Sequence, residues 1–172
     1  MSNIQINAAD QIVDVSCSTA VADLQQALNE HSLMLGVLHD PDSELSVGEL
    51  FMNGGHNLWR GAFGYLRDQV LAGSWALNDG DQISTGARVV KSVAGYDLTR
   101  LLLGSHDHLA SCESLCLRLH PAFKRRHFYS IELAQYLQYS HFDLNPCSAF
   151  QAADGNIIIS SHFELKREYL TA

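Results

Sequence analysis

Residues 89–105 read VVKSVAGYDLTRLLLGS, and this stretch decides which fold we expect. Its Asp97 carries a side-chain oxygen that can cap a helix, so we predict a short helix from there through Leu103. Gly104 ends that helix, because glycine adopts positive φ angles at little steric cost. The stretch therefore predicts a helix and a sharp turn between two extended regions.

The segments on either side of this stretch have the patterns of β-strands. Upstream, residues 69–77 and 82–85 predict two strands, and Asn78-Asp79-Gly80 between them is a turn signal, so we expect a hairpin. Downstream, residues 112–119 alternate between leucines on one face and mostly small or polar residues, including Cys112 and Cys116, on the other.

The N-terminal part predicts a strand followed by a helix. Residues 12–17 alternate as a half-buried strand does, and Ser18 or Thr19 then offers a side chain to cap a helix whose apolar residues recur at helical spacing. A second apolar run covers residues 33–38. Residues 43–64 are rich in glycine and small polar residues, and we predict that they are mostly loop.

The chain changes character after Pro121. We predict a strand over residues 127–133, a short helix over 134–139, and a hairpin whose arms, 147–151 and 156–165, meet at an Asp154-Gly155 turn. The sequence thus predicts an α+β domain over residues 1–121 and a small β-rich extension over residues 122–172.

Composition restricts the classes of partner. The chain has 172 residues, 47% of them hydrophobic, and a formal net charge of -8, which argues against nucleic acid or an anionic membrane surface as partner. Its longest apolar runs are far below the roughly 20 residues of a membrane span, so we expect no membrane insertion. Neither a secretory signal nor paired cysteine spacing is visible, and we expect free thiols and a cytoplasmic location.

Three blocks of the sequence resemble the flavin subunits of glycolate oxidase. Residues 89–105 are similar to their Lys-Asn-Val-Ala-Gly-Tyr-Asp-Leu stretch, residues 64–71 resemble Gly-Ser-Val-Arg-Asp-Phe-Val-Leu, and residues 46–48 stand where they have Thr-Val-Gly-Gly. The order and spacing of the blocks agree over residues 10–121. Those subunits belong to the vanillyl-alcohol-oxidase, or PCMH, type of FAD proteins.

The resemblance implies the fold. It identifies residues 1–121 as the second half of a PCMH-type FAD-binding domain, with a mixed or antiparallel sheet and flanking helices. In the family, a preceding subdomain wraps the FAD pyrophosphate and a long C-terminal domain binds the substrate. We expect the first to be missing from this chain and the second to be reduced to the short extension.

The resemblance also implies a set of cofactor-binding candidates. Glycine-rich backbone approaches a pyrophosphate or a flavin closely, and the stretch after the short helix is expected to lie along the flavin. The candidates are Gly48, Asn53, Gly54, Gly55, Arg67, Lys91, Tyr96, Gly104, Ser105, Leu109 and Cys112.

The chain departs from the family motif at three positions. After the short helix the family reads Gly-Ser-x-Gly-x-Leu-Gly, whereas this chain has Asp107 and Ala110 at the second and third glycines. Glu49 replaces a further glycine. Two of these changes add a carboxylate, which we expect to weaken binding of an anionic cofactor.

Several interpretations stay open at this point. Arg67 and Asp68 resemble a catalytic pair, although we favour a local ion pair; Lys91 and Tyr96 can reach a ligand or pin a loop by hydrogen bonds. His106 and His108 flank a carboxylate as metal ligands can, but alternate residues of an extended chain point apart, so we expect no metal site.

Two functions fit the resemblance. In the first, the chain is an FAD-binding module of a 2-hydroxy-acid oxidoreductase, completed by a second subunit. In the second, it is a pseudoenzyme that binds no FAD and acts in assembly or regulation. A homodimer that pairs exposed strand edges is a further way to cover the incomplete domain.

Overall fold

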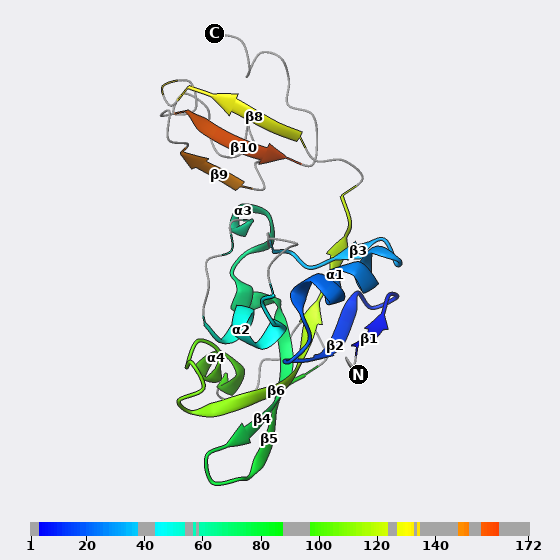
Figure 1. The fold of residues 1–172 in the computed structure, drawn as a ribbon, viewed down its shortest axis with the longest axis vertical. Helices are drawn as coiled ribbons and strands as arrows, with labels where there is room; N and C mark the ends of the chain where they lie inside the picture. The colour runs from blue at the N-terminus through cyan, green and yellow to red at the C-terminus, as the bar shows by residue number, and fades with distance from the viewer. Residues whose placement is uncertain are drawn as a thin grey trace. The chain divides into compact units, whose positions relative to one another are not determined.

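The computed structural model describes residues 4–37, 44–53, 57, 59–87, 97–123, 127–132, 134, 148–151 and 156–161 (Figure 1). The chain divides into two compact units. The first comprises residues 1–56 and 65–122, and the second comprises residues 57–64 and 123–172. Each unit is described separately below.

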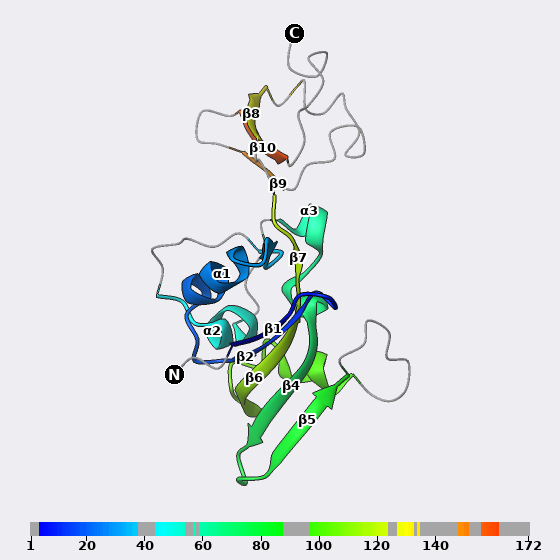
Figure 2. The ribbon, with the colours of Figure 1, turned by 90° about the vertical axis from the view of Figure 1, so that its right-hand side faces the viewer.

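The described part of the first unit is built on a five-stranded antiparallel sheet in the order β1-β2-β6-β4-β5 (Figure 2). Its middle strand, β6, pairs with β2 so that Val13 lies opposite Leu117 and Val15 lies opposite Leu115. These four side chains are buried, because both strands turn their apolar residues to one face. The strands are β1 (Ile4–Asn7), β2 (Ile12–Ser16), β4 (Val70–Leu77), β5 (Gln82–Gly86) and β6 (Ala110–Arg118).

Three short α-helices add apolar residues to the same core as the sheet. They are α1 (Val21–Asn29), α2 (Val47–Met52) and α4 (Leu98–Leu102), and each contributes to the cluster that contains Trp75 and Leu115. A 3₁₀ helix, η1 (Leu66–Gln69), leads into β4, and a two-stranded pair joins β3 (Leu33–Met34) to β7 (His120–Pro121). The predicted strands and the hairpin of this unit are confirmed.

The predicted cap of α1 is wrong. The N-cap residue is Ala20, which makes no side-chain capping bond, and neither Ser18 nor Thr19 takes that position. The backbone N–H of Val21 instead donates to the carbonyl oxygen of Leu45 at 2.9 Å. A neighbouring segment thus satisfies an N–H group that a capping side chain satisfies in other helices.

The glycine-rich segment, predicted as mostly loop, contains two helices, α2 and α3 (Arg60–Phe63). The first is α2, which begins with a capping box: the backbone N–H of Glu49 donates to the Ser46 hydroxyl at 3.2 Å, and the Glu49 carboxylate accepts from the Ser46 N–H at 2.8 Å. The spacing Ser46-x-x-Glu49 is the sequence signature of this motif. Glycine content outweighed that signal in our prediction, which is therefore wrong for residues 47–52.

The capping box makes part of the stability depend on pH. The backbone N–H of Ser46, and then its hydroxyl, lower the pKa of Glu49 from its ordinary value of 4.5. A carboxyl whose pKa is lower in the folded state stabilises the fold above the unfolded value and loses that contribution as pH falls through the folded value. We expect Glu49→Gln to lose less stability than the wild type as the pH falls below 4.5 and through the lowered pKa of Glu49, as followed by urea unfolding.

A second variant tests the same motif at neutral pH. Ser46→Ala removes the hydroxyl that caps α2 and should lower the free energy of unfolding by about 1 kcal/mol. The variant should also lose less stability than the wild type when the pH is lowered, because one of the two hydrogen bonds to the Glu49 carboxylate is lost. Unchanged acid sensitivity in both variants would contradict this explanation of the Glu49 pKa.

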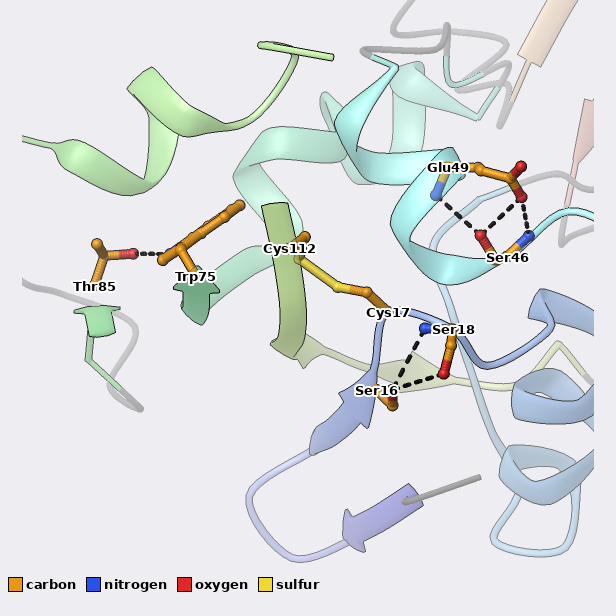
Figure 3. The surroundings of a disulfide bond; sticks show 8 residues. All are labelled: Ser16, Cys17, Ser18, Ser46, Glu49, Trp75, Thr85 and Cys112. Atoms are coloured by element: carbon orange, nitrogen blue, oxygen red, sulfur yellow. Dashed lines mark hydrogen bonds between the residues drawn. A yellow bond between two sulfur atoms is a disulfide. The ribbon is translucent and has the colours of Figure 1, made fainter. Parts of the chain in front are cut away.

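The prediction of free thiols is wrong for two of the four cysteines. Cys17, just after β2, forms a disulfide bond with Cys112 on β6 (Figure 3). The two residues are 95 positions apart in sequence, so no local spacing revealed the pair; the antiparallel pairing of β2 with β6 brings them together. Cys116 is a buried thiol, and Cys147 lies outside the described residues. The cytoplasmic location stays a prediction.

The described part of the second unit contains a three-stranded antiparallel sheet in the order β8-β10-β9. Its strands are β8 (His127–Ile131), β9 (Ser148–Gln151) and β10 (Ile157–Ser161). The pairing of β9 with β10 confirms the hairpin predicted for the C-terminal region. Helix α3 (Arg60–Phe63) belongs to this unit, and Trp59, Phe63 and Phe123 pack together with ring centroids 5.6–6.0 Å apart. Residues 135–139 and 152–155, predicted as helix and turn, lie outside the described residues.

No helix in the parts of the chain described above is long and apolar enough to cross a membrane.

Candidate cofactor-binding rim

A buried chain of hydrogen bonds fixes α4 against the sheet. The indole N–H of Trp75 on β4 donates to the Thr85 hydroxyl on β5 at 2.8 Å, and the Thr99 hydroxyl of α4 donates to the same oxygen at 2.8 Å. The Trp75 and Thr85 side chains are labelled in Figure 3. Asp97 caps α4 through the Arg100 backbone N–H, as predicted. The position of α4 determines where the loop after it begins.

The loop between α4 and β6, residues 104–109, has an unusual backbone. Gly104 has a φ of 74°, as predicted, and His106 and Asp107 have φ values of 51° and 59°. Non-glycine residues adopt this left-handed region at a cost, which aspartate tolerates better than most. The loop therefore keeps, at Asp107, the conformation that explains a glycine at the corresponding position of the resembling family.

Asn53 joins the end of α2 to this loop. Its side-chain oxygen lies 3.2 Å from Nδ1 of His106, and its backbone N–H donates to the carbonyl oxygen of Glu49 at 3.2 Å. Two blocks that are far apart in sequence, and that the resemblance assigned to one site, thus lie together. We call Asn53 and residues 104–109 the rim.

The rim contains a polar atom that needs a partner. The Ser105 Oγ is buried, and among the described residues it has no hydrogen-bond partner. A buried hydroxyl without a partner is costly, so a group that bonds to it would bind favourably. Leu109 exposes 48% of its surface and adds an apolar contact. The rim can therefore offer a hydroxyl and an apolar side chain to a ligand.

Gly48 has a packing function in the structure. Its N–H donates to the carbonyl oxygen of Cys17 at 2.8 Å, and a Cβ at this position would lie 3.0 Å from that oxygen. The absence of a side chain thus lets α2 approach the end of β2 closely. A cofactor contact by Gly48 stays a prediction, as does one by Cys112, which lies in the disulfide bond.

The predicted ion pair between Arg67 and Asp68 is wrong. Asp68 pairs with Arg100 of α4 at 3.0 Å, and the Arg67 guanidinium lies 4.8 Å from the centre of the Tyr65 ring. The two neighbours diverge because η1 gives their segment a helical backbone, on which adjacent side chains do not face each other. Asp68 thus holds η1 to α4.

The remaining candidates lie outside the described residues: Gly54, Gly55, Lys91 and Tyr96. Within the described residues there is no group of three or more histidine, cysteine, aspartate or glutamate side chains that could hold a metal ion.

A solved structure of alkyldihydroxyacetonephosphate synthase matches this fold. The TM-score is 0.72, and the match covers 87% of this chain and 28% of that one at 13% sequence identity, so it bears on the fold alone. The antiparallel sheet with its short helices is therefore that of a PCMH-type FAD-binding domain fragment, as predicted.

The profile of the FAD binding domain family matches residues 1–86, which is half of the chain. The chain belongs to this family, whose description names FAD as the ligand of the domain. The predicted recognition is confirmed.

Several relatives carry names that describe an activity, and two of them represent the two activities named. The mitochondrial cytochrome-type D-lactate dehydrogenase of Arabidopsis thaliana is 32% identical over 114 residues, which are 66% of this chain and 20% of that protein. The glycolate oxidase subunit GlcD of Bacillus subtilis is 42% identical over 59 residues, or 34% of this chain and 13% of that subunit. The chain thus spans about a fifth or less of the length of these two proteins.

Proposed function

We propose that this chain forms one wall of an FAD site in an oxidoreductase that acts on a 2-hydroxy acid. The observation that carries the proposal is the rim, where a buried hydroxyl with no partner among the described residues lies in a loop that keeps the left-handed backbone of a glycine motif. The substrate class is supported by the names of the relatives, because lactate and glycolate are both 2-hydroxy acids.

Each part of the rim has a task in this proposal. The Ser105 hydroxyl binds a polar atom of the cofactor. Asn53 holds the loop in position through His106, and Leu109 packs against an apolar part of the ligand. Bound FAD supplies the redox chemistry, and the protein supplies placement.

The proposal includes a partner. In this proposal the rim is one wall of the FAD site, and a second subunit supplies another wall and the residues that act on the substrate. The alternative is a homodimer that pairs through β1 and β5, the strands at the edges of the sheet, so that a second copy of the chain supplies the other wall.

A second candidate function is that of a pseudoenzyme that binds no FAD and acts in assembly or regulation. The observation that favours it is Asp107, which places an exposed carboxylate in the middle of the rim. A negative charge there opposes the binding of an anionic cofactor.

Replacing Asp107 distinguishes the two functions. In Asp107→Gly the left-handed backbone becomes unstrained and the carboxylate is removed, so we expect FAD to bind about tenfold more tightly and the protein to gain about 1 kcal/mol of stability. Titration with FAD, followed by flavin fluorescence, measures the affinity, and urea unfolding measures the stability.

His108→Gly is the matched control. It makes the same loop more flexible at a residue that is not among those with positive φ, so it should bring no gain in stability. If neither the wild type nor Asp107→Gly binds FAD at tens of micromolar, the enzyme proposal is wrong for the isolated chain and the pseudoenzyme is supported.

A further inference from the structure

We infer that Cys17 and Cys112 form a reversible thiol–disulfide site that controls how firmly the rim is held. The inference concerns the protein itself, and only its consequence for FAD affinity rests on the proposed function. Three observations carry it: the position of the bond, the contacts of Cys17 with α2, and the contact of α2 with the rim.

The bond links two strands at the place where the chain leaves the sheet. Cys17 follows β2, Cys112 lies on β6, and their Cα atoms are 6.1 Å apart (Figure 3). Cys17 is 6% exposed, whereas Cys112 is only partly buried. Cys112 is therefore the more accessible of the two cysteines to an attacking thiolate, and access is one of the factors that set the rate of thiol–disulfide exchange.

Cys17 also supports the beginning of α2. Its carbonyl oxygen accepts the Gly48 N–H at 2.8 Å, and its own N–H donates to the carbonyl oxygen of Glu113 on β6 at 2.9 Å. A Cβ at Gly48 would lie 3.0 Å from the Cβ of Cys17, so helix and cysteine are in direct contact. A shift of Cys17 must therefore shift the first turn of α2 or break its bond to Gly48.

The other end of α2 reaches the rim. The helix has only six residues, and the residue after it, Asn53, contacts His106 of the loop. A short helix moves as one body, so a change at its first turn reaches its last. The disulfide bond thus fixes Cys112, which lies three positions after the end of the loop. Through Cys17 it also fixes α2, the helix whose end contacts the loop.

A dithiol reductant completes the chemistry. Its thiolate attacks the sulfur of Cys112, the disulfide breaks, and Cys17 leaves as a thiolate that takes up a proton. The second thiol of the reductant then attacks the mixed disulfide and releases the Cys112 thiol. Two electrons and two protons pass from the dithiol to the protein, and the dithiol becomes a disulfide.

Hydrogen exchange tests the inference without FAD. We expect residues 47–53 and 104–109 to exchange at least about fivefold faster after reduction by dithiothreitol, while strands β8 and β10 of the second unit exchange at an unchanged rate. Alkylation and mass spectrometry report the redox state of each cysteine. Cys17→Ala should match the reduced wild type and no longer respond to dithiothreitol.

Cys116→Ala is the control, because Cys116 is a buried thiol on the same strand. It should keep the full response to dithiothreitol. Equal exchange in the oxidised and reduced wild type would overturn the inference, and so would alkylation of Cys17 and Cys112 in protein kept under air without reductant. These outcomes do not depend on Cys17→Ala folding.

FAD titration in both redox states separates this inference from the proposed function. We expect the reduced protein to bind FAD about fivefold more weakly, because part of the binding energy must then order the rim. If neither the oxidised nor the reduced protein binds FAD, the proposed function is wrong, and the hydrogen-exchange result alone then tests the inference. Equal binding in both states would overturn the effect on the cofactor.

Discussion

Gly86→Ala is expected to lower the free energy of unfolding by about 3 kcal/mol. Gly86 ends β5 with a φ of 78°, a region that alanine adopts only with strain. A Cβ there would overlap the carbonyl oxygen of Leu71 and lie 2.8 Å from the Cα of Ala72, both backbone atoms of the paired strand. Because backbone cannot rotate away as a side chain does, the hairpin must open at this end.

Gly80→Ala is the matched control for this variant. Gly80 also has a positive φ, of 94°, but a Cβ at this turn would meet no atom within 4 Å. Only the conformational strain remains, and the expected loss is about 1 kcal/mol. The difference between the two urea midpoints therefore measures the close approach of the two strands. Equal losses would show that this approach does not determine the stability.

Trp75→Leu is expected to cost about 3 kcal/mol and to loosen α4. Trp75 is fully buried, and its ring lies against the backbone of Gly73, where an added Cβ would be 2.8 Å from it. Leucine leaves a cavity and also removes the N–H that donates to Thr85. Because Thr99 of α4 donates to the same hydroxyl, we expect faster hydrogen exchange in α4 as well as a lower midpoint in urea.

Thr85→Val isolates the hydrogen bonds from the packing. Valine keeps the shape of threonine but leaves the indole N–H and the Thr99 hydroxyl without their acceptor, at an expected cost of about 2 kcal/mol. The variant should loosen α4 without a cavity. If α4 exchanges as slowly as in the wild type, Thr85 does not position this helix.

The sequence predicted the extended elements and α4 well, because their signals are local. Alternation from residue 112 onward, the Asn78-Asp79-Gly80 turn and the Asp97 cap each act within a few residues, and the structure has β6, the hairpin and α4 at these positions. Helix α2 was missed although its capping box is also local, because the glycines around it favoured a loop.

The contacts in the rim and around it that could not be predicted depend on distant pairing. The Cys17–Cys112 bond spans 95 residues, and the Asn53–His106 contact spans 53. Neither leaves a trace in local spacing. Asp68 likewise pairs with Arg100, 32 residues away, and not with its neighbour. The resemblance identified these segments as one site, but which side chains meet follows from the order of the strands.

That strand order has a consequence for how the chain is made. Strand β6 ends at Arg118, yet it separates β2 from β4, both of which are synthesised long before it. Until β6 has left the ribosome, the β1–β2 and β4–β5 hairpins have no common neighbour and each exposes an unpaired edge. Non-local pairing of this kind slows folding, so the nascent protein passes through a stage that is vulnerable to aggregation and needs chaperones most.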